Sequence, residues 1–128
     1  MLYELPKLKE LDLSNNELQN IGTLPTKVSS YLRSALFSRN KITSLPGDTS
    51  CLKNLVYISL SFNDLKIIPA SLFRDTKVHR MDLQGNGFDK KQLTEMEGFL
   101  DFQRRRKAVI DKGMAGGLKP NTSLCGFD

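Results

Sequence analysis

One stretch of the chain, residues 55–69, constrains the fold more than any other. It reads LVYISLSFNDLKIIP, with apolar residues at fixed distances on both sides of Asn63. The same frame recurs around Asn16, Asn40 and Asn86, so the spacings between successive asparagines are 24, 23 and 23 residues. Self-similarity at a fixed period of this length is typical of arrays in which structural repeats stack on one another. We therefore expect a stack of similar coils.

The residues before each asparagine predict a short strand with one buried face. Ile58 and Leu60 alternate with the polar or amphipathic residues Tyr57, Ser59 and Ser61, which is the period of a strand. A single coil cannot bury its own apolar side, whereas stacked coils share a continuous core. The equivalent apolar pairs in the other coils are Leu11 and Leu13, Ala35 and Phe37, and Met81 and Leu83.

The repeated asparagines are predicted to be structural. A chain that turns inside a core leaves backbone amides and carbonyls without partners, at a cost of about 1–3 kcal/mol for each group. An asparagine side chain offers both hydrogen-bond donors and an acceptor, so it can satisfy groups of its own coil and of the neighbouring one. We expect a ladder formed by Asn16, Asn40, Asn63 and Asn86.

The frame L-x-x-L-x-L-x-x-N-x-L-x-x-L-P resembles the leucine-rich repeat family, and the LPxxLF arrangement of residues 68–73 resembles its short intracellular, Ras-group-related type. The resemblance implies an α/β fold, a right-handed superhelical solenoid with short parallel strands on its concave face and a C-terminal capping helix. Residues 1–88 would hold about four repeats, the first preceded by a partial coil. No polar cap precedes that coil, so we expect a longer chain, a partner that covers this end, or a tolerated frayed end.

The pattern changes to a helical one after Phe88. Asp89 and Gln92 have the spacing of a capping box, Gly98 is expected to break or bend the helix, and Gly113 to end it near residue 112. Residues 89–112 are therefore predicted to be a capping helix in two pieces. Its predicted apolar residues are Leu93, Met96, Leu100, Phe102, Val109 and Ile110.

The segment from Lys91 to Lys107 is similar to the C-terminus of small cytoplasmic leucine-rich-repeat proteins, the group that includes leucine-rich repeat-containing protein fifty-seven and its plant counterparts. This resemblance implies an intracellular, non-enzymatic protein. Residues 113–128 are rich in glycine and are expected to form a flexible tail, in which Leu118, Leu124 and Phe127 are available to dock on a neighbour.

Composition and motifs exclude several classes of function. The 128 residues suit one domain, and the net charge of +5 is a mild excess. Cys51 and Cys125 form no CxxC pair, and no secretory signal or membrane-spanning run is visible, so we expect a cytoplasmic protein without membrane association. His79 has no ligand-spaced partner, and no P-loop, GxSxG or GxGxxG motif occurs. We therefore predict no catalytic residue, metal or cofactor.

The outward positions of the strands are the candidate binding surface, because the concave face is the usual binding surface of the family that the chain resembles. Tyrosine and arginine are enriched at interface hot spots, and an outward leucine on a strand is otherwise unexplained. The predicted protein-binding residues are Leu36, Arg39, Tyr57, Phe62 and Arg80. Ordinary solvated strand surface is the alternative interpretation of each.

A basic run is the second candidate surface; it consists of Arg104, Arg105, Arg106 and Lys107. Three interpretations compete: a solvated helix face favoured by the helix dipole, a site for an acidic protein, and a nucleic-acid site. The third is disfavoured because no aromatic stacking platform accompanies the charge.

The sequence as a whole predicts a non-catalytic protein–protein interaction module that binds a protein through its concave strand face and serves as a peripheral subunit of a larger assembly. One alternative is a regulator of an enzyme such as a phosphatase or a small GTPase. The other is weak nucleic-acid binding through the basic helix. Neither the partner nor the oligomeric state follows from the residues.

Overall fold

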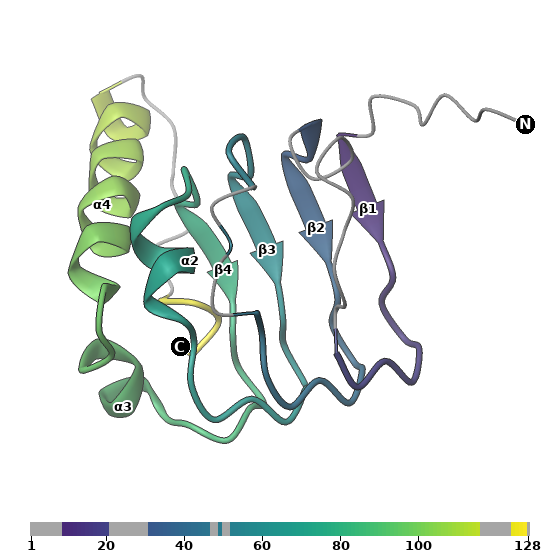
Figure 1. The fold of residues 1–128 in the computed structure, drawn as a ribbon. Helices are drawn as coiled ribbons and strands as arrows, with labels where there is room; N and C mark the ends of the chain where they lie inside the picture. Colours follow the sequence, from purple (N-terminus) through teal and green to yellow (C-terminus); the bar gives the residue numbers. More distant parts are fainter. Residues whose placement is uncertain (1–8, 21–30, 47–48, 50–51, 116–123, 128) are drawn as a thin grey trace, which may run out of the picture.

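Four short strands form one parallel sheet, in which their spatial order is their order in the sequence (Figure 1). The computed structural model describes residues 9–20, 31–46, 49, 52–115 and 124–127. The strands are β1 (Glu10–Asp12), β2 (Ser34–Leu36), β3 (Tyr57–Ser59) and β4 (Arg80–Asp82). Each has three residues and pairs in parallel with the next.

The period of the sequence sets the register of the sheet. Ala35 pairs with Leu11 on one side and with Ile58 on the other, and Ile58 pairs with Met81. Equivalent residues of successive coils therefore stand in rows, with alternate rows on opposite faces. The central row faces the core, and we call the opposite side the strand face, whose rows are Glu10, Ser34, Tyr57 and Arg80, and Asp12, Leu36, Ser59 and Asp82.

The apolar positions of the repeated frame build one core behind the sheet. The central strand residues Ala35, Ile58 and Met81 are buried. In the first coil, Leu11 and Leu13 are only partly buried and pack against this core. The fully buried aliphatic residues that follow or precede the strands are Leu32, Ile42, Leu55, Leu60, Leu65, Ile68, Leu72, Val78 and Leu83.

Three described helices lie towards the β4 end of the sheet (Figure 1). They are α2 (Ala70–Arg74), α3 (Lys90–Thr94) and α4 (Phe99–Ala115). The capping box predicted at the start of α3 is confirmed, because the Asp89 carboxylate accepts from the Gln92 amide at 2.7 Å and the Gln92 side chain accepts from the Asp89 amide at 2.9 Å. Helix α4 packs on α2.

An aromatic cluster fixes α4 against α2. Phe73 of α2 lies edge-on to Phe99, with 5.8 Å between ring centroids, and Phe102 lies 5.7 Å from Phe99. All three rings are buried. Such ring pairs stabilise by about 0.5–1.5 kcal/mol beyond the area that they bury. The two helices are therefore held mainly by apolar contact.

The predicted break at Gly98 is confirmed, because α3 ends at Thr94, Gly98 has a φ of +86° and α4 begins at Phe99. Three expectations for the helical region are wrong. The helical period does not continue across the break, so Leu100 is 67% exposed rather than buried with Leu93. Val109, predicted to belong to the apolar face of the second piece, is 45% exposed. Gly113 lies within α4 instead of ending it, since the helix runs to Ala115. Near a helix end, the cost of glycine, about 1 kcal/mol, is tolerated.

The end of the chain returns to the sheet, so the expectation of a flexible tail is wrong for residues 124–127. The Cys125 carbonyl accepts from the Leu83 amide at 2.9 Å. Phe127 lies 6.2 Å from the ring of Phe88, and Leu124 is buried. Leu118 lies outside the described residues.

This contact repeats a bond found between the coils. Leu13 donates to the Leu36 carbonyl, Phe37 to Ser59 and Leu60 to Asp82, just as Leu83 donates to Cys125. Residues 124–127 therefore take the place of the next coil against β4, and they satisfy an edge amide that would otherwise lack a backbone partner.

Candidate functional site

Three of the four repeated asparagines connect their coil to the one before it, whereas Asn16, within the described residues, donates to the Leu13 and Ser14 carbonyls of its own coil. The Asn63 amide donates to the Phe37 carbonyl of the preceding coil and to the Leu60 carbonyl of its own, both at 3.0 Å, while its oxygen accepts from the Ile42 amide at 3.1 Å. Asn40 and Asn86 repeat this arrangement one coil earlier and one coil later. The ladder bonds the backbones of successive coils at their turns, and the asparagine side chains are not part of the strand face.

The residue before each asparagine is left-handed in all four coils. The φ angles are +61° at Asn15, +58° at Arg39, +58° at Phe62 and +78° at Gly85. Glycine and asparagine adopt this conformation readily, whereas it costs other residues about 1–2 kcal/mol. The first and last coils therefore carry suited residues, and the two middle coils carry Arg39 and Phe62 at a conformational cost.

Arg39 and Phe62 interact with each other across this turn row. The Arg39 guanidinium carbon lies 4.6 Å from the centroid of the Phe62 ring. The ring in turn covers Gly85, where a Cβ atom would come within 2.5 Å of it. A cation–aromatic contact at an exposed site stabilises by about 0.5–1 kcal/mol, so it offsets part of the backbone cost. Phe62 stays 46% exposed.

A second cation–aromatic pair lies at the other end of the strands. The Arg80 guanidinium carbon is 4.3 Å from the centroid of the Tyr57 ring, one strand away in register. The Tyr57 hydroxyl donates to the Asp82 carboxylate. Burial, followed by this bond and the charge of Asp82, raises the pKa of Tyr57 above its usual value, so the hydroxyl remains a donor at neutral pH.

Three of the five predicted protein-binding residues, Leu36, Tyr57 and Arg80, lie in the strand-face rows, and Arg39 and Phe62 lie in the turns that follow β2 and β3. Leu36 is half-buried on β2, and its backbone carbonyl accepts from the Leu13 amide of the preceding coil. The alternation predicts that Ser59 and Ser61 face outward, but both are buried. Ser59 belongs to a strand-face row, and Ser61 follows the end of β3 by two residues.

The β1 side of the strand face is acidic. Glu10 and Asp12 are exposed. The Ser14 amide donates to the Asp12 carboxylate at 3.0 Å, and this bond holds the pKa of Asp12 below its usual value. The strand face therefore carries two carboxylates at β1, whereas on its other side Arg80 and Arg39 stand beside one carboxylate, Asp82.

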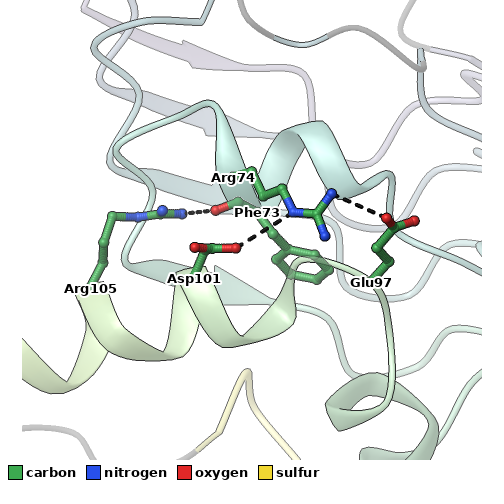
Figure 2. Close-up of polar contacts among 5 residues, drawn as sticks. All are labelled: Phe73, Arg74, Glu97, Asp101 and Arg105. Carbon is green, nitrogen blue, oxygen red and sulfur yellow. Dashed lines mark hydrogen bonds and ion pairs between the residues drawn. The ribbon is translucent and has the colours of Figure 1, made fainter.

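The basic run does not form one patch. Arg105 turns inward, where its Nε donates to the Val78 carbonyl at 2.9 Å and its terminal nitrogen donates to the Phe73 carbonyl (Figure 2). Burial lowers the pKa of Arg105, and the charge of Asp101 opposes this shift. Arg105 therefore closes the C-terminal end of α2, and the structure separates it from the other three basic residues.

Surface ion pairs surround this contact. Arg74 of α2 meets Glu97 at 3.2 Å and Asp101 of α4 at 3.6 Å (Figure 2). Arg104 and Lys107 are exposed, and Arg106 is half-buried. The four basic residues are consecutive in the sequence, which predicted a single patch, but the helical period distributes their side chains around α4.

The described residues offer little for chemistry. Among them, no group of three His, Cys, Asp or Glu side chains is placed to hold a metal ion. Burial, then the charge of Arg105, lowers the pKa of His79, so this imidazole is neutral at pH 7. Burial raises the pKa of the Cys125 thiol to about 12, which keeps it protonated. In the described part of the chain, no helix is both long and apolar enough to span a membrane.

Comparisons with known proteins agree with this architecture. The family model described as Leucine Rich Repeat matches residues 7–30. A relative, protein flightless-1 homolog of Caenorhabditis elegans, is 30% identical over 98 residues, which cover 75% of this chain and 8% of that protein. These two matches support a leucine-rich repeat family. The parallel sheet with its helices fits the α/β fold of leucine-rich repeats, and the chain spans only a small part of the length of this curated relative.

Proposed function

We propose that this chain is a non-catalytic protein–protein interaction module that binds a protein through its strand face. The observation that carries the proposal is the pair of cation–aromatic contacts, Arg80 on Tyr57 in a strand-face row and Arg39 on Phe62 in the turns that follow the strands. Stacked arginine and tyrosine side chains are rigid, partly desolvated and typical of interface hot spots. Leucine-rich repeats are in general interaction domains, which agrees with this reading.

The finer architecture belongs to the same proposal. Residues 1–88 form a right-handed solenoid of the short, Ras-group-related type, with the strand face on its concave side. Residues 89–112, with the end of α4, cap it as in small cytoplasmic leucine-rich-repeat proteins. The asparagine ladder supports the first statement, and the aromatic cluster of Phe73, Phe99 and Phe102 supports the second. The module acts in the cytoplasm as a peripheral subunit of a larger assembly.

The test compares partner recovery by two variants. One carries Leu36→Ala, Tyr57→Ala and Arg80→Ala on the strand face, and the matched control carries Arg104→Ala and Lys107→Ala on α4. Each variant and the wild type serve as bait, and the captured proteins are quantified by mass spectrometry. Selective loss of captured proteins with the triple variant is expected. Equal recovery of every protein by the wild type and a folded triple variant would refute the site.

A further inference from the structure

The two cation–aromatic pairs converge on one strand from its two neighbours. Arg80 reaches Tyr57 from β4, and Arg39 reaches Phe62 from the coil of β2. Tyr57 begins β3, and Phe62 follows the end of this strand by three residues. Two guanidinium groups therefore lie over the same coil, one near each end of its outward surface.

Stacking leaves the hydrogen-bonding edges of both guanidinium groups available. A ring covers the face of a planar guanidinium, whereas its N–H groups point along the edges, where they match a carboxylate in bidentate fashion. Within the described ranges, neither Arg39 nor Arg80 takes part in an ion pair. The nearby Asp82 carboxylate accepts from the Tyr57 hydroxyl.

The backbone suggests that the side chains at the turn are present for more than the fold. Arg39 and Phe62 occupy left-handed positions that Asn15 and Gly85 fill elsewhere without comparable strain. A bulky residue held in a disfavoured conformation points to a role for its side chain. Here the two side chains stack on each other and form one end of the basic surface.

The opposite side of the strand face would repel an acidic ligand. Glu10 and Asp12 on β1 are exposed carboxylates, and Asp12 is held in its charged form by the Ser14 amide. An acidic ligand is thus directed to the β2–β4 side, where Arg39 and Arg80 outweigh the β4 carboxylate of Asp82, which accepts from the Tyr57 hydroxyl.

We infer that the strand face binds an extended acidic segment of a protein partner, laid along β3 with one carboxylate at Arg80 and another at Arg39. This inference rests on the function proposed above and names its ligand chemistry. The five backbone steps from Tyr57 to Phe62 span at most about 18 Å. In an extended peptide, side chains four residues apart share a face and lie about 13 Å apart. The segment therefore carries acidic residues at positions i and i+4.

A display library of random short peptides tests the inference. The full chain selects binders, which are then measured against Arg39→Glu/Arg80→Glu and against the control Arg104→Glu/Lys107→Glu, which makes the same charge change on α4. We expect selected peptides with two carboxylates four residues apart. They should bind the strand-face variant at least about tenfold more weakly, the factor for one lost charge-assisted bond, and should bind the control as they bind the wild type.

Charge exchange provides the second arm. Peptides in which both acidic residues become lysine should lose binding to the wild type and regain it with Arg39→Glu/Arg80→Glu. The neutral variant Arg39→Gln/Arg80→Gln should bind the acidic peptides with intermediate affinity. Circular dichroism and the unfolding midpoint establish that each variant is folded before its binding is compared.

The outcomes separate this inference from the proposed function. Selected peptides that are neutral, that need Leu36 and Tyr57, and that bind both arginine variants normally would overturn the acidic ligand and leave the interaction surface standing. Selected peptides that bind the arginine variants and the triple alanine variant as well as the wild type would overturn both.

Discussion

Asn63 offers a sharp test of the asparagine ladder, because its side chain is 5% exposed and forms bonds to two coils. In Asn63→Ala the Ile42 amide loses the acceptor that it has among the described residues. Three carbonyls also lose one donor each, but each keeps another, since Asn40, Asn86 and the Arg39 amide still donate to them.

These losses set the size of the effect. An unsatisfied buried amide costs about 2 kcal/mol, and the loss of one of two bonds at a carbonyl costs about 0.5 kcal/mol, so the variant should lose about 3–4 kcal/mol of unfolding free energy. Urea unfolding followed by far-UV circular dichroism measures the loss. Asn16→Ala is the matched control: Asn16 is exposed and donates to the Leu13 and Ser14 carbonyls, so water can replace it at a cost below about 1 kcal/mol.

A shape-preserving variant separates the donors from the acceptor. Asn63→Asp keeps the acceptor for the Ile42 amide, but when ionised it faces three carbonyl oxygens without a proton to donate. This environment raises the carboxyl pKa in the folded state above its unfolded value of about 3.9. The folded protein then binds the extra proton, so the stability deficit relative to wild type should be smallest at low pH and grow as the pH rises above about 4.

Two results would refute this account of the ladder. One is equal loss of stability, within about 0.5 kcal/mol, in Asn63→Ala and Asn16→Ala, which is the ordinary scatter of surface substitutions. The other is a deficit of Asn63→Asp that does not change between acid and neutral pH, which would mean that the amide donors do not matter.

Three further predictions concern the core, α4 and the end of the chain. Leu60→Ala should cost about 2–5 kcal/mol in urea unfolding, and a cost below about 0.5 would place this side chain outside the core. Arg105→Leu should cost about 1.5–3 kcal/mol through its two carbonyl bonds, whereas Arg104→Leu should stay within about 0.5; equal values would deny the inward role of Arg105. Gly126→Val should displace the end of the chain, because Gly126 has a φ of +84°, which a β-branched residue adopts only with strain, and because the Gln84 side chain would also have to move away from the new Cβ. The Cys125 thiol of this variant should then react with a maleimide at pH 8, whereas the buried thiol of the wild type, with its pKa raised to about 12, should react slowly. Peptide mapping measures the labelling of Cys125. Equal labelling rates in the two proteins would show that the docking of residues 124–127 does not protect this thiol.

The sequence by itself determined the period, the strand register and the identity of the buried rows. Apolar alternation around Ala35, Ile58 and Met81 and an asparagine in each turn are local patterns, and stacking coils of equal length leaves one register in which they meet. The capping box at Asp89 also follows from adjacent residues alone. The candidate binding residues could be selected because outward strand positions follow from the same alternation.

The tertiary structure decided what those side chains do. Arg105 is one of four consecutive basic residues, and only the packing of α4 on α2 brings it to the carbonyls of Phe73 and Val78. The return of residues 124–127 to β4 depends on a contact across 42 residues, for which no periodic signal exists. The pairing of Arg39 with Phe62 requires left-handed turns in two successive coils, so it arises from distant backbone geometry and not from composition.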